Sequence, residues 1–143
     1  MSAITSKKSH YGSAKIVFFD GVCNICNASI DYVMRNSKNN DLKVASLQSE
    51  FANQFLSKEK LKLGYETFIY YDGSSFSTAS KAVFQVSKEL NGFLPRFIRL
   101  FRALPRFLTD KVYYLVAKNR YFLAGKRSTC RIPNKNELAR FIT

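Results

Sequence analysis

The chain has 143 residues, of which 46% are hydrophobic and 15% aromatic, enough to bury the core of one domain and with little room for two. Its 23 Lys and Arg residues outnumber 10 Asp and Glu residues and give a net charge of +13, which favours contact with an anionic partner. Three cysteines, an odd number, do not suit the disulfide scaffold of a small secreted protein. No apolar run approaches the ~18 residues of a membrane-spanning helix. These observations exclude a globally disordered chain, a disulfide-rich secreted domain and a bitopic membrane protein.

The basic excess lies mainly in one segment. Residues 93–131 hold ten Lys and Arg residues and a single acidic residue, Asp110. Residues 1–14 are polar and lack the apolar stretch of a secretory signal. We therefore predict a disordered tail at 1–14, a single domain over 15–143 and a cytoplasmic protein. In that reducing compartment the cysteines are expected to be thiols, ligands or catalytic groups.

The first half of the chain predicts alternating strands and helices. Runs of β-branched and aromatic residues indicate strands, apolar residues at helical spacing indicate helices, and Asp72-Gly73 indicates a tight turn. This order is typical of an α/β fold whose first two strands are parallel. The expected elements are a strand at Lys15–Phe19, a helix at Val22–Arg35, a strand at Leu42–Leu47, a short helix at Ser49–Ser57, strands at Thr67–Tyr71 and Ser75–Ser77, and a helix that Thr78 caps.

The second half predicts helices. Pro95 suits the first turn of a helix, and Pro105 ends or kinks that helix. Asp110 is expected to cap a further helix that stops near Gly125. Asn134-Lys135-Asn136-Glu137 resembles a capping box that opens a last short helix.

The motif that carries chemistry is Asp20-Gly21-Val22-Cys23-Asn24-Ile25-Cys26, which follows the first predicted strand and opens a helix. The C-x-x-C spacing brings two sulfur atoms together in the first turn, where the helix dipole favours a thiolate at Cys23. Cys26 lies one turn further along on the apolar stripe and is expected to be the more buried thiol. The motif therefore predicts that Cys23 attacks a substrate disulfide and that Cys26 resolves the mixed disulfide.

Other roles for these residues stay open. The two cysteines also fit half of a zinc site that Cys130 and His10 complete, or small hydrophobic side chains in the core. Asp20 fits a proton acceptor during exchange, most simply for the proton of Cys26. It fits equally well, or better, a residue that caps the helix or closes the turn.

At this point the chain resembles a known family. Asp20-x-x-Cys23-x-x-Cys26 resembles the motif that names the DCC family of predicted thiol-disulfide oxidoreductases. The resemblance covers roughly residues 15–142. It is carried further by Ala45-Ser46-Leu47-Gln48-Ser49-Glu50, Ser80 with Ala82, Leu104-Pro105-Arg106-Phe107, Asn119-Arg120-Tyr121, and Gly125-Lys126-Arg127-Ser128-Thr129-Cys130 followed by Pro133.

This resemblance implies a thioredoxin-like fold of three layers, with a central sheet of about four strands and additional helices in the basic part from about residue 93. It also implies a disulfide reductase or isomerase activity, with Cys23 and Cys26 as the redox pair. We expect no metal or cofactor besides this dithiol. Gln48 and Cys130 lie in matching segments and are candidate accessory residues. Cys130 fits a third exchanging thiol and a buried structural cysteine equally well.

Two positions depart from the related patterns. The closing motif of the family often has an acidic residue where this chain has Ser128. Thioredoxins place a cis-proline before the third strand, whereas this chain has Tyr65-Glu66-Thr67 there, and a trans bond is the default without proline. Thr67 is therefore a candidate accessory residue in a docking loop that differs from that of thioredoxins.

The basic segment places Arg96, Arg99 and Arg102 on one third of a helix, and Arg106 follows. This pattern is typical of an amphipathic helix packed on a core, and it also suits an anionic membrane or nucleic acid. We expect the opposite, apolar face to pack on the core and the arginines to recruit an acidic protein or a membrane surface. Nucleic acid is disfavoured because no known nucleic-acid module is present. The apolar face consists of Phe93, Phe97, Leu100, Phe101 and Leu104.

Two functions are consistent with these observations. The first is a thiol-disulfide oxidoreductase of the protein-disulfide reductase type, which acts on a disulfide-containing protein or a small thiol substrate in the cytoplasm or at the membrane surface. The second is a non-catalytic binding module, in which the cysteine pair is a zinc site or a relic and the basic helices recruit an anionic partner.

Overall fold

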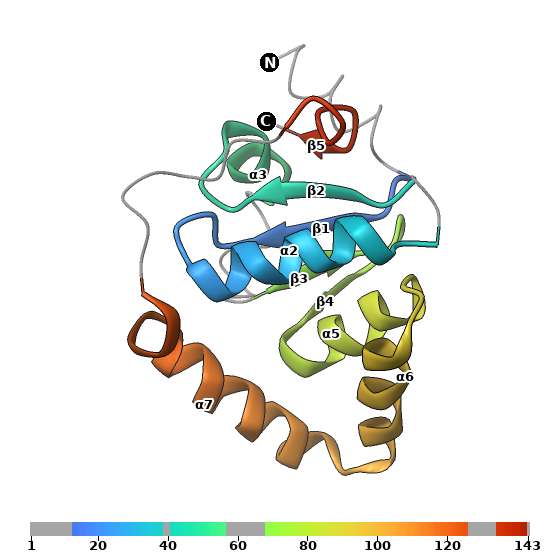
Figure 1. Cartoon of the computed structure of the whole chain (residues 1–143), viewed down its shortest axis with the longest axis vertical. Helices are drawn as coiled ribbons and strands as arrows, with labels where there is room; N and C mark the ends of the chain where they lie inside the picture. The colour runs from blue at the N-terminus through green and yellow to red at the C-terminus, as the bar shows by residue number, and fades with distance from the viewer. Residues whose placement is uncertain (1–12, 39–40, 57–67, 126–133, 143) are drawn as a thin grey trace.

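The computed structural model describes residues 13–38, 41–56, 68–125 and 134–142 (Figure 1). The predicted tail at 1–14 falls almost wholly outside these ranges. In chain order the elements are β1 (Ile16–Phe19), α2 (Asn24–Asn36), β2 (Lys43–Ser46), α3 (Glu50–Phe55), β3 (Ile69–Tyr71), β4 (Phe76–Thr78), α5 (Ala79–Lys88), α6 (Phe93–Leu100), the 3-10 turn η1 (Phe101–Ala103), α7 (Arg106–Ala124) and β5 (Phe141–Ile142).

The strands form one sheet in the order β4-β3-β1-β2-β5. β1 pairs with β2 in the parallel direction, as predicted, and with β3 in the antiparallel direction. β3 pairs with β4 in the antiparallel direction, and β2 pairs with β5 in parallel. A β-α-β unit followed by an antiparallel hairpin and the helix α5 is the thioredoxin-like arrangement. The predicted fold class is therefore confirmed.

β1 is buried on both faces and separates two hydrophobic cores. Successive side chains of a strand point to opposite faces of the sheet. Val17 and Phe19 pack in a core that α2 and α5 cover, whereas Ile16 and Phe18 pack in a core that α3 covers. The molecule therefore has three layers, and β1 delivers the residues that follow it to one edge of the sheet (Figure 1).

The sheet has one strand more than predicted. Asn134 and Glu137 do form a capping box, in which the N–H of Asn134 donates to Oε2 of Glu137 (3.2 Å) and the N–H of Glu137 donates to Oδ1 of Asn134 (3.1 Å). The chain then continues in turns rather than in the predicted helix, and Phe141–Ile142 pairs with β2. Arg140 holds this segment beside β2, because its buried guanidinium donates to the carbonyl oxygen of Leu42 (3.2 Å) directly before β2.

The basic helices begin at positions that differ in part from the prediction. Pro95 lies in the first turn of α6, as predicted, and η1 separates α6 from α7. Pro105 precedes α7, which begins at Arg106. Asp110, the predicted cap, therefore lies inside α7, where it forms an ion pair with Arg106 (3.4 Å). Gly125 follows the last residue of α7, as predicted.

The apolar face of α6 and η1 does not pack on the core, so this prediction was wrong. Phe93 is 81% exposed and Leu100 is 71% exposed, and Phe97, Phe101 and Leu104 are exposed as well. Helical periodicity groups apolar side chains on one side of a helix but does not say what covers that side. No helix among the described residues has both the length and the apolar character that crossing a membrane requires.

Candidate active site

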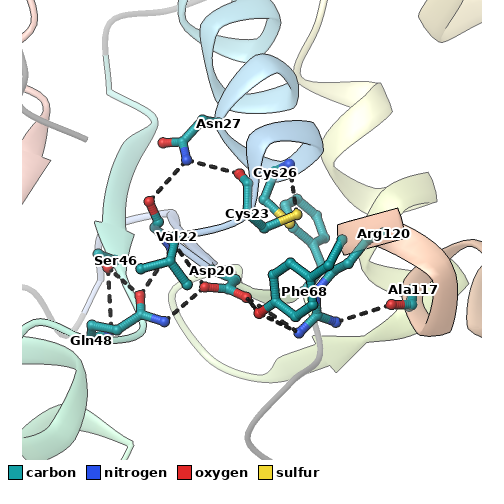
Figure 2. Close-up of polar contacts among 12 residues, drawn as sticks. Asp20, Val22, Cys23, Cys26, Asn27, Ser46, Gln48, Phe68, Ala117 and Arg120 are labelled. Carbon is teal, nitrogen blue, oxygen red and sulfur yellow. Dashed lines mark hydrogen bonds and ion pairs between the residues drawn. The ribbon is translucent and has the colours of Figure 1, made fainter. Parts of the chain in front are cut away.

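Cys23 is the N-cap residue of α2, directly after the turn that follows β1. Its extended backbone (φ −90°, ψ 124°) allows its Sγ to accept a hydrogen bond from the N–H of Cys26, at 3.3 Å (Figure 2). The side chain of Asn27 holds the turn, since its Nδ2 donates to the carbonyl oxygens of Gly21 (2.9 Å) and Cys23 (2.8 Å). The two thiols therefore lie together in the first turn of a helix that follows a buried strand, as the motif predicted.

The two thiols differ in exposure, in the opposite sense to the prediction. Cys23 is fully buried, with 0% of its surface exposed, whereas Cys26 is half-buried. The apolar stripe of α2 led to the expectation that Cys26 would be the covered thiol. In the structure, the part of that stripe around Cys26 faces a cleft instead of a closed core.

The cleft has a volume of about 600 Å³ and lies between α2, α5, α6 and α7. Its walls are mainly apolar, and Cys26 forms part of the wall that α2 contributes. Asp20 and Arg120 supply a polar portion of the lining. Apolar side chains from all four helices line the rest, among them Ile25, Val33, Val86, Leu94, Ile98 and Val116.

Burial raises the pKa of Cys26 to about 12, and the hydrogen bond with Cys23 raises it as well. Cys26 therefore keeps its proton at neutral pH. Because only a thiolate attacks a disulfide efficiently, Cys26 is a poor nucleophile in this environment.

This raised pKa predicts slow alkylation of Cys26 in a Cys23→Ser variant. Burial is the largest cause of the shift and persists in that variant, so the labelling rate at pH 7 should be low and should rise about tenfold per pH unit through the alkaline range. Iodoacetamide labelling at a series of pH values, read for the Cys26 peptide by mass spectrometry, measures this profile. The same variant unfolded in urea is the control and should titrate near ~8.5. A folded-state profile that coincides with the unfolded one would contradict the assignment.

Asp20, directly after β1, is buried and accepts hydrogen bonds at both carboxylate oxygens (Figure 2). Oδ2 accepts from the hydroxyl of Tyr121 (2.6 Å) and forms an ion pair with Arg120 (3.2 Å). Oδ1 accepts from the N–H of Val22 (3.1 Å) and from Nε2 of Gln48 (2.8 Å). The carboxylate thus ties the turn before the C-x-x-C motif to α7 and to the loop after β2.

These contacts decide the charge state of Asp20. Burial on its own raises the pKa of this carboxyl group, but the hydrogen bonds that it accepts and the positive charge of Arg120 outweigh burial, so that its pKa lies below the ordinary value. Asp20 is therefore ionised at neutral pH and already engaged by several donors. This arrangement favours the structural role that the sequence left open beside that of proton acceptor.

Arg120 and Tyr121 are site residues that the sequence did not assign. Arg120 is buried and lies one hundred positions from Asp20, so no local spacing connects the two residues. The segment Asn119-Arg120-Tyr121, which carries part of the family resemblance, was the signal that pointed to this position.

Of the three candidate accessory residues, Gln48 lies at the site. Besides donating to Asp20, its Oε1 accepts from the N–H of Gly21 (2.9 Å) and from the hydroxyl of Ser46 (2.7 Å). Thr67 and Cys130 lie outside the described residues.

The four candidate arginines lie apart from the thiols. Arg96 and Arg99 belong to α6, Arg102 to η1 and Arg106 to the start of α7. None of the four lines the cleft beside Cys26.

The zinc alternative depended on residues that the structure does not describe. His10 and Cys130 both fall outside the described ranges. Within those ranges, no group of three or more His, Cys, Asp or Glu side chains is arranged to hold a metal ion.

Comparison with known proteins points to one family. The family model described as DCC1-like thiol-disulfide oxidoreductase matches residues 17–126, which include the C-x-x-C motif, Asp20 and Arg120. The chain is 33% identical over 129 residues to the uncharacterized protein YuxK of Bacillus subtilis (strain 168), which covers 90% of this chain and 93% of YuxK. It is 27% identical over 118 residues to the DCC family protein At1g52590, chloroplastic, of Arabidopsis thaliana, which covers 82% of this chain and 69% of that protein. No solved structure matches the chain. With most of its length and the whole cysteine motif inside the match, the chain belongs to the DCC1-like thiol-disulfide oxidoreductase family.

Proposed function

We propose that the chain reduces a disulfide in a protein or a small molecule, with Cys23 as the nucleophile and Cys26 as the resolving thiol. The observation that carries this proposal is the difference between the two thiols. Cys23 Sγ caps α2 and accepts the N–H of Cys26, whereas burial keeps Cys26 protonated. A helix N-terminus stabilises negative charge on sulfur. Membership of the family supports the reaction class.

In the proposed cycle the Cys23 thiolate attacks one sulfur of the substrate R–S–S–R′. The Cys23–S–S–R mixed disulfide forms and R′–S⁻ leaves, taking the proton of Cys26 to become R′–SH. The Cys26 thiolate then attacks Cys23 Sγ, which forms the Cys23–Cys26 disulfide and releases R–S⁻, and R–S⁻ takes a proton from water. The substrate disulfide is reduced to two thiols and the protein dithiol is oxidised, and an external dithiol restores the reduced protein.

The cleft supports a substrate that carries apolar groups beside its disulfide. Such groups gain free energy when they leave water for walls formed by side chains such as Ile25, Val86 and Leu94. A disulfide in the cleft would then meet the sulfur pair from the side of Cys26. Because Cys23 is fully buried, attack by Cys23 requires neighbouring side chains to move during each cycle.

The proposed reaction uses a reduced dithiol. Compartments that keep thiols reduced favour this starting state, and the cytoplasm is one of them. We therefore propose a cytoplasmic location.

A trapping experiment tests the proposed function. In a Cys26→Ser/Cys130→Ser variant, Cys23 has no resolving partner and should accumulate as a mixed disulfide with glutathione or with an apolar cystine peptide. The matched control is Cys23→Ser/Cys130→Ser, which should form at least about a hundredfold less adduct at pH 7 because its remaining thiol stays protonated. Mass spectrometry under non-reducing conditions measures both adducts. Equal adduct on Cys26, or one zinc ion bound per wild-type chain on isolation, would overturn the proposal.

A further inference from the structure

Exposed apolar side chains gather on the basic helices. Among the described residues, every exposed large apolar side chain except Leu138 belongs to residues 93–123. Proteins that remain free in solution rarely leave so many large apolar side chains exposed in one stretch of chain. We define the α6–α7 face by six of these side chains and the cations between them. The six are Phe93, Phe97 and Leu100 on α6 and Phe107, Leu115 and Phe122 on α7.

Within the described residues, the six side chains of this face remain exposed. α7 turns Tyr113 and Arg120 towards the body of the molecule, where each forms hydrogen bonds. Phe107, Leu115 and Phe122 lie on a different stripe, at positions i, i+8 and i+15, and Phe122 is 90% exposed. The two helices meet through η1 at the end of the molecule that lies opposite α3 and β5 (Figure 1). Leu100 and Phe107 lie near η1 at that end, whereas Phe93 and Phe122 lie near the opposite ends of their helices.

The charges of the face are almost all positive. Arg96, Arg102, Lys111 and Lys118 are exposed among the apolar side chains. Asp110 is the single acidic residue of the sequence between positions 93 and 125. Its carboxylate is engaged by Arg106 and by the hydroxyl of Ser80. The face therefore combines uncovered apolar side chains with uncompensated cations.

We propose that the α6–α7 face docks on the surface of an anionic phospholipid bilayer. On α7, cations and apolar residues share one stripe in the order Phe107, Lys111, Leu115, Lys118, Phe122. A bilayer offers a layer of phosphates directly above an apolar layer, so one stripe can satisfy both kinds of side chain, with lysines extending to the head groups. An acidic protein would need apolar side chains placed between its carboxylates to match this stripe, whereas an anionic bilayer offers both layers everywhere, so we favour the bilayer.

Vesicle co-sedimentation of the full chain tests docking. Binding to phosphatidylcholine vesicles that contain phosphatidylglycerol should be at least about tenfold tighter than binding to phosphatidylcholine alone, and salt should weaken it. Arg96→Gln/Arg102→Gln should bind the mixed vesicles about twenty-five-fold more weakly, because each surface cation contributes about fivefold. Phe93→Ser/Phe122→Ser, which alters two highly exposed side chains, should lose more than about tenfold.

The matched control is Lys135→Gln/Leu138→Ser, which removes an exposed cation and an exposed apolar side chain next to β5, away from the face. This variant should bind vesicles as the wild type does, and circular dichroism checks the fold of each variant. Equal binding to both vesicle types, no binding, or insensitivity to both α6–α7 variants would overturn the proposal. So would binding to polyglutamate without binding to vesicles, or a dimer that Phe93→Ser/Phe122→Ser dissociates while vesicles are not bound.

Docking does not depend on the dithiol, so Cys23→Ser/Cys26→Ser should bind vesicles as well as the wild type does. Failure of the docking proposal therefore leaves the proposed reaction standing, and the reverse holds too.

Discussion

Replacement of Cys23 by serine is expected to lower the rate of disulfide reduction by about a thousandfold or more. A serine hydroxyl does not attack a disulfide at neutral pH, and Cys26 keeps its proton because burial raises its pKa to about 12. Serine is among the preferred N-cap residues, so α2 should still begin at the same position. The variant therefore separates chemistry from folding, and its free energy of unfolding should stay within about 1 kcal/mol of the wild type. Turnover of glutathione disulfide with a dithiol donor measures the rate.

Cys130→Ser is the control for this experiment, because it removes a thiol and leaves both cysteines of the C-x-x-C motif in place. It should retain turnover if Cys130 takes no part in exchange. If Cys23→Ser retained most of the activity, another thiol would be the nucleophile and the proposed cycle would be wrong.

Replacement of Asp20 by alanine is expected to lower the free energy of unfolding by about 3–5 kcal/mol, because it leaves the buried guanidinium of Arg120 without its carboxylate. Urea denaturation under reducing conditions measures the change. The matched control is Glu89→Ala, which removes an ion pair of shorter distance (2.7 Å) but greater exposure, with Lys15. That pair should contribute less than about 1 kcal/mol. A similar loss in the free energy of unfolding in both variants would contradict the expectation that burial makes the Asp20–Arg120 pair contribute more to stability.

The effect of Asp20 should depend on pH with a definite sign. In the folded protein the pKa of Asp20 lies below its ordinary value, although burial alone would raise it, because hydrogen bonds and Arg120 favour the carboxylate. Its contribution to stability is therefore complete above the unfolded pKa of about 3.9 and is lost as the pH falls through the lower folded pKa. The stability difference between wild type and Asp20→Ala should shrink in that acidic range. A difference that stays constant down to the acid transition would contradict this assignment.

The sequence predicted the parts of the fold that depend on local pattern. The apolar run at Lys15–Phe19 and the helical spacing after Val22 gave β1 and α2 with ends shifted by one or two residues. The position of Cys23 at the start of the helix followed from the same pattern. Local pattern was sufficient there because the spacing of apolar side chains indicates the type of element, whichever distant segment covers them.

The predictions that were wrong concern burial, which depends on the segments that cover a residue. The phenylalanines of α6 have the spacing of a core-packed face, yet Phe93 and Phe97 are exposed. The same difficulty reversed the expected burial of Cys23 and Cys26. Periodicity relates side chains within one helix, whereas burial depends on distant segments of the chain.

Contacts that join distant segments could not be predicted from the sequence either. β5 is two residues long and pairs with β2 across about a hundred positions, so no strand pattern announces it. Arg120 looks like one more cation of a basic segment until the fold places it against Asp20.

The distance in sequence between Asp20 and Arg120 has a consequence for the newly made protein. Synthesis runs from the N-terminus, so the ribosome adds Cys23 and Cys26 about a hundred residues before it adds Arg120 and Tyr121. At ~5–20 residues per second this leaves an interval of roughly 5–20 s. During that interval the two thiols exist on a nascent chain whose Asp20 still lacks its partners from α7. The proposed active site is therefore completed late in biosynthesis, although its cysteines are among the first residues made.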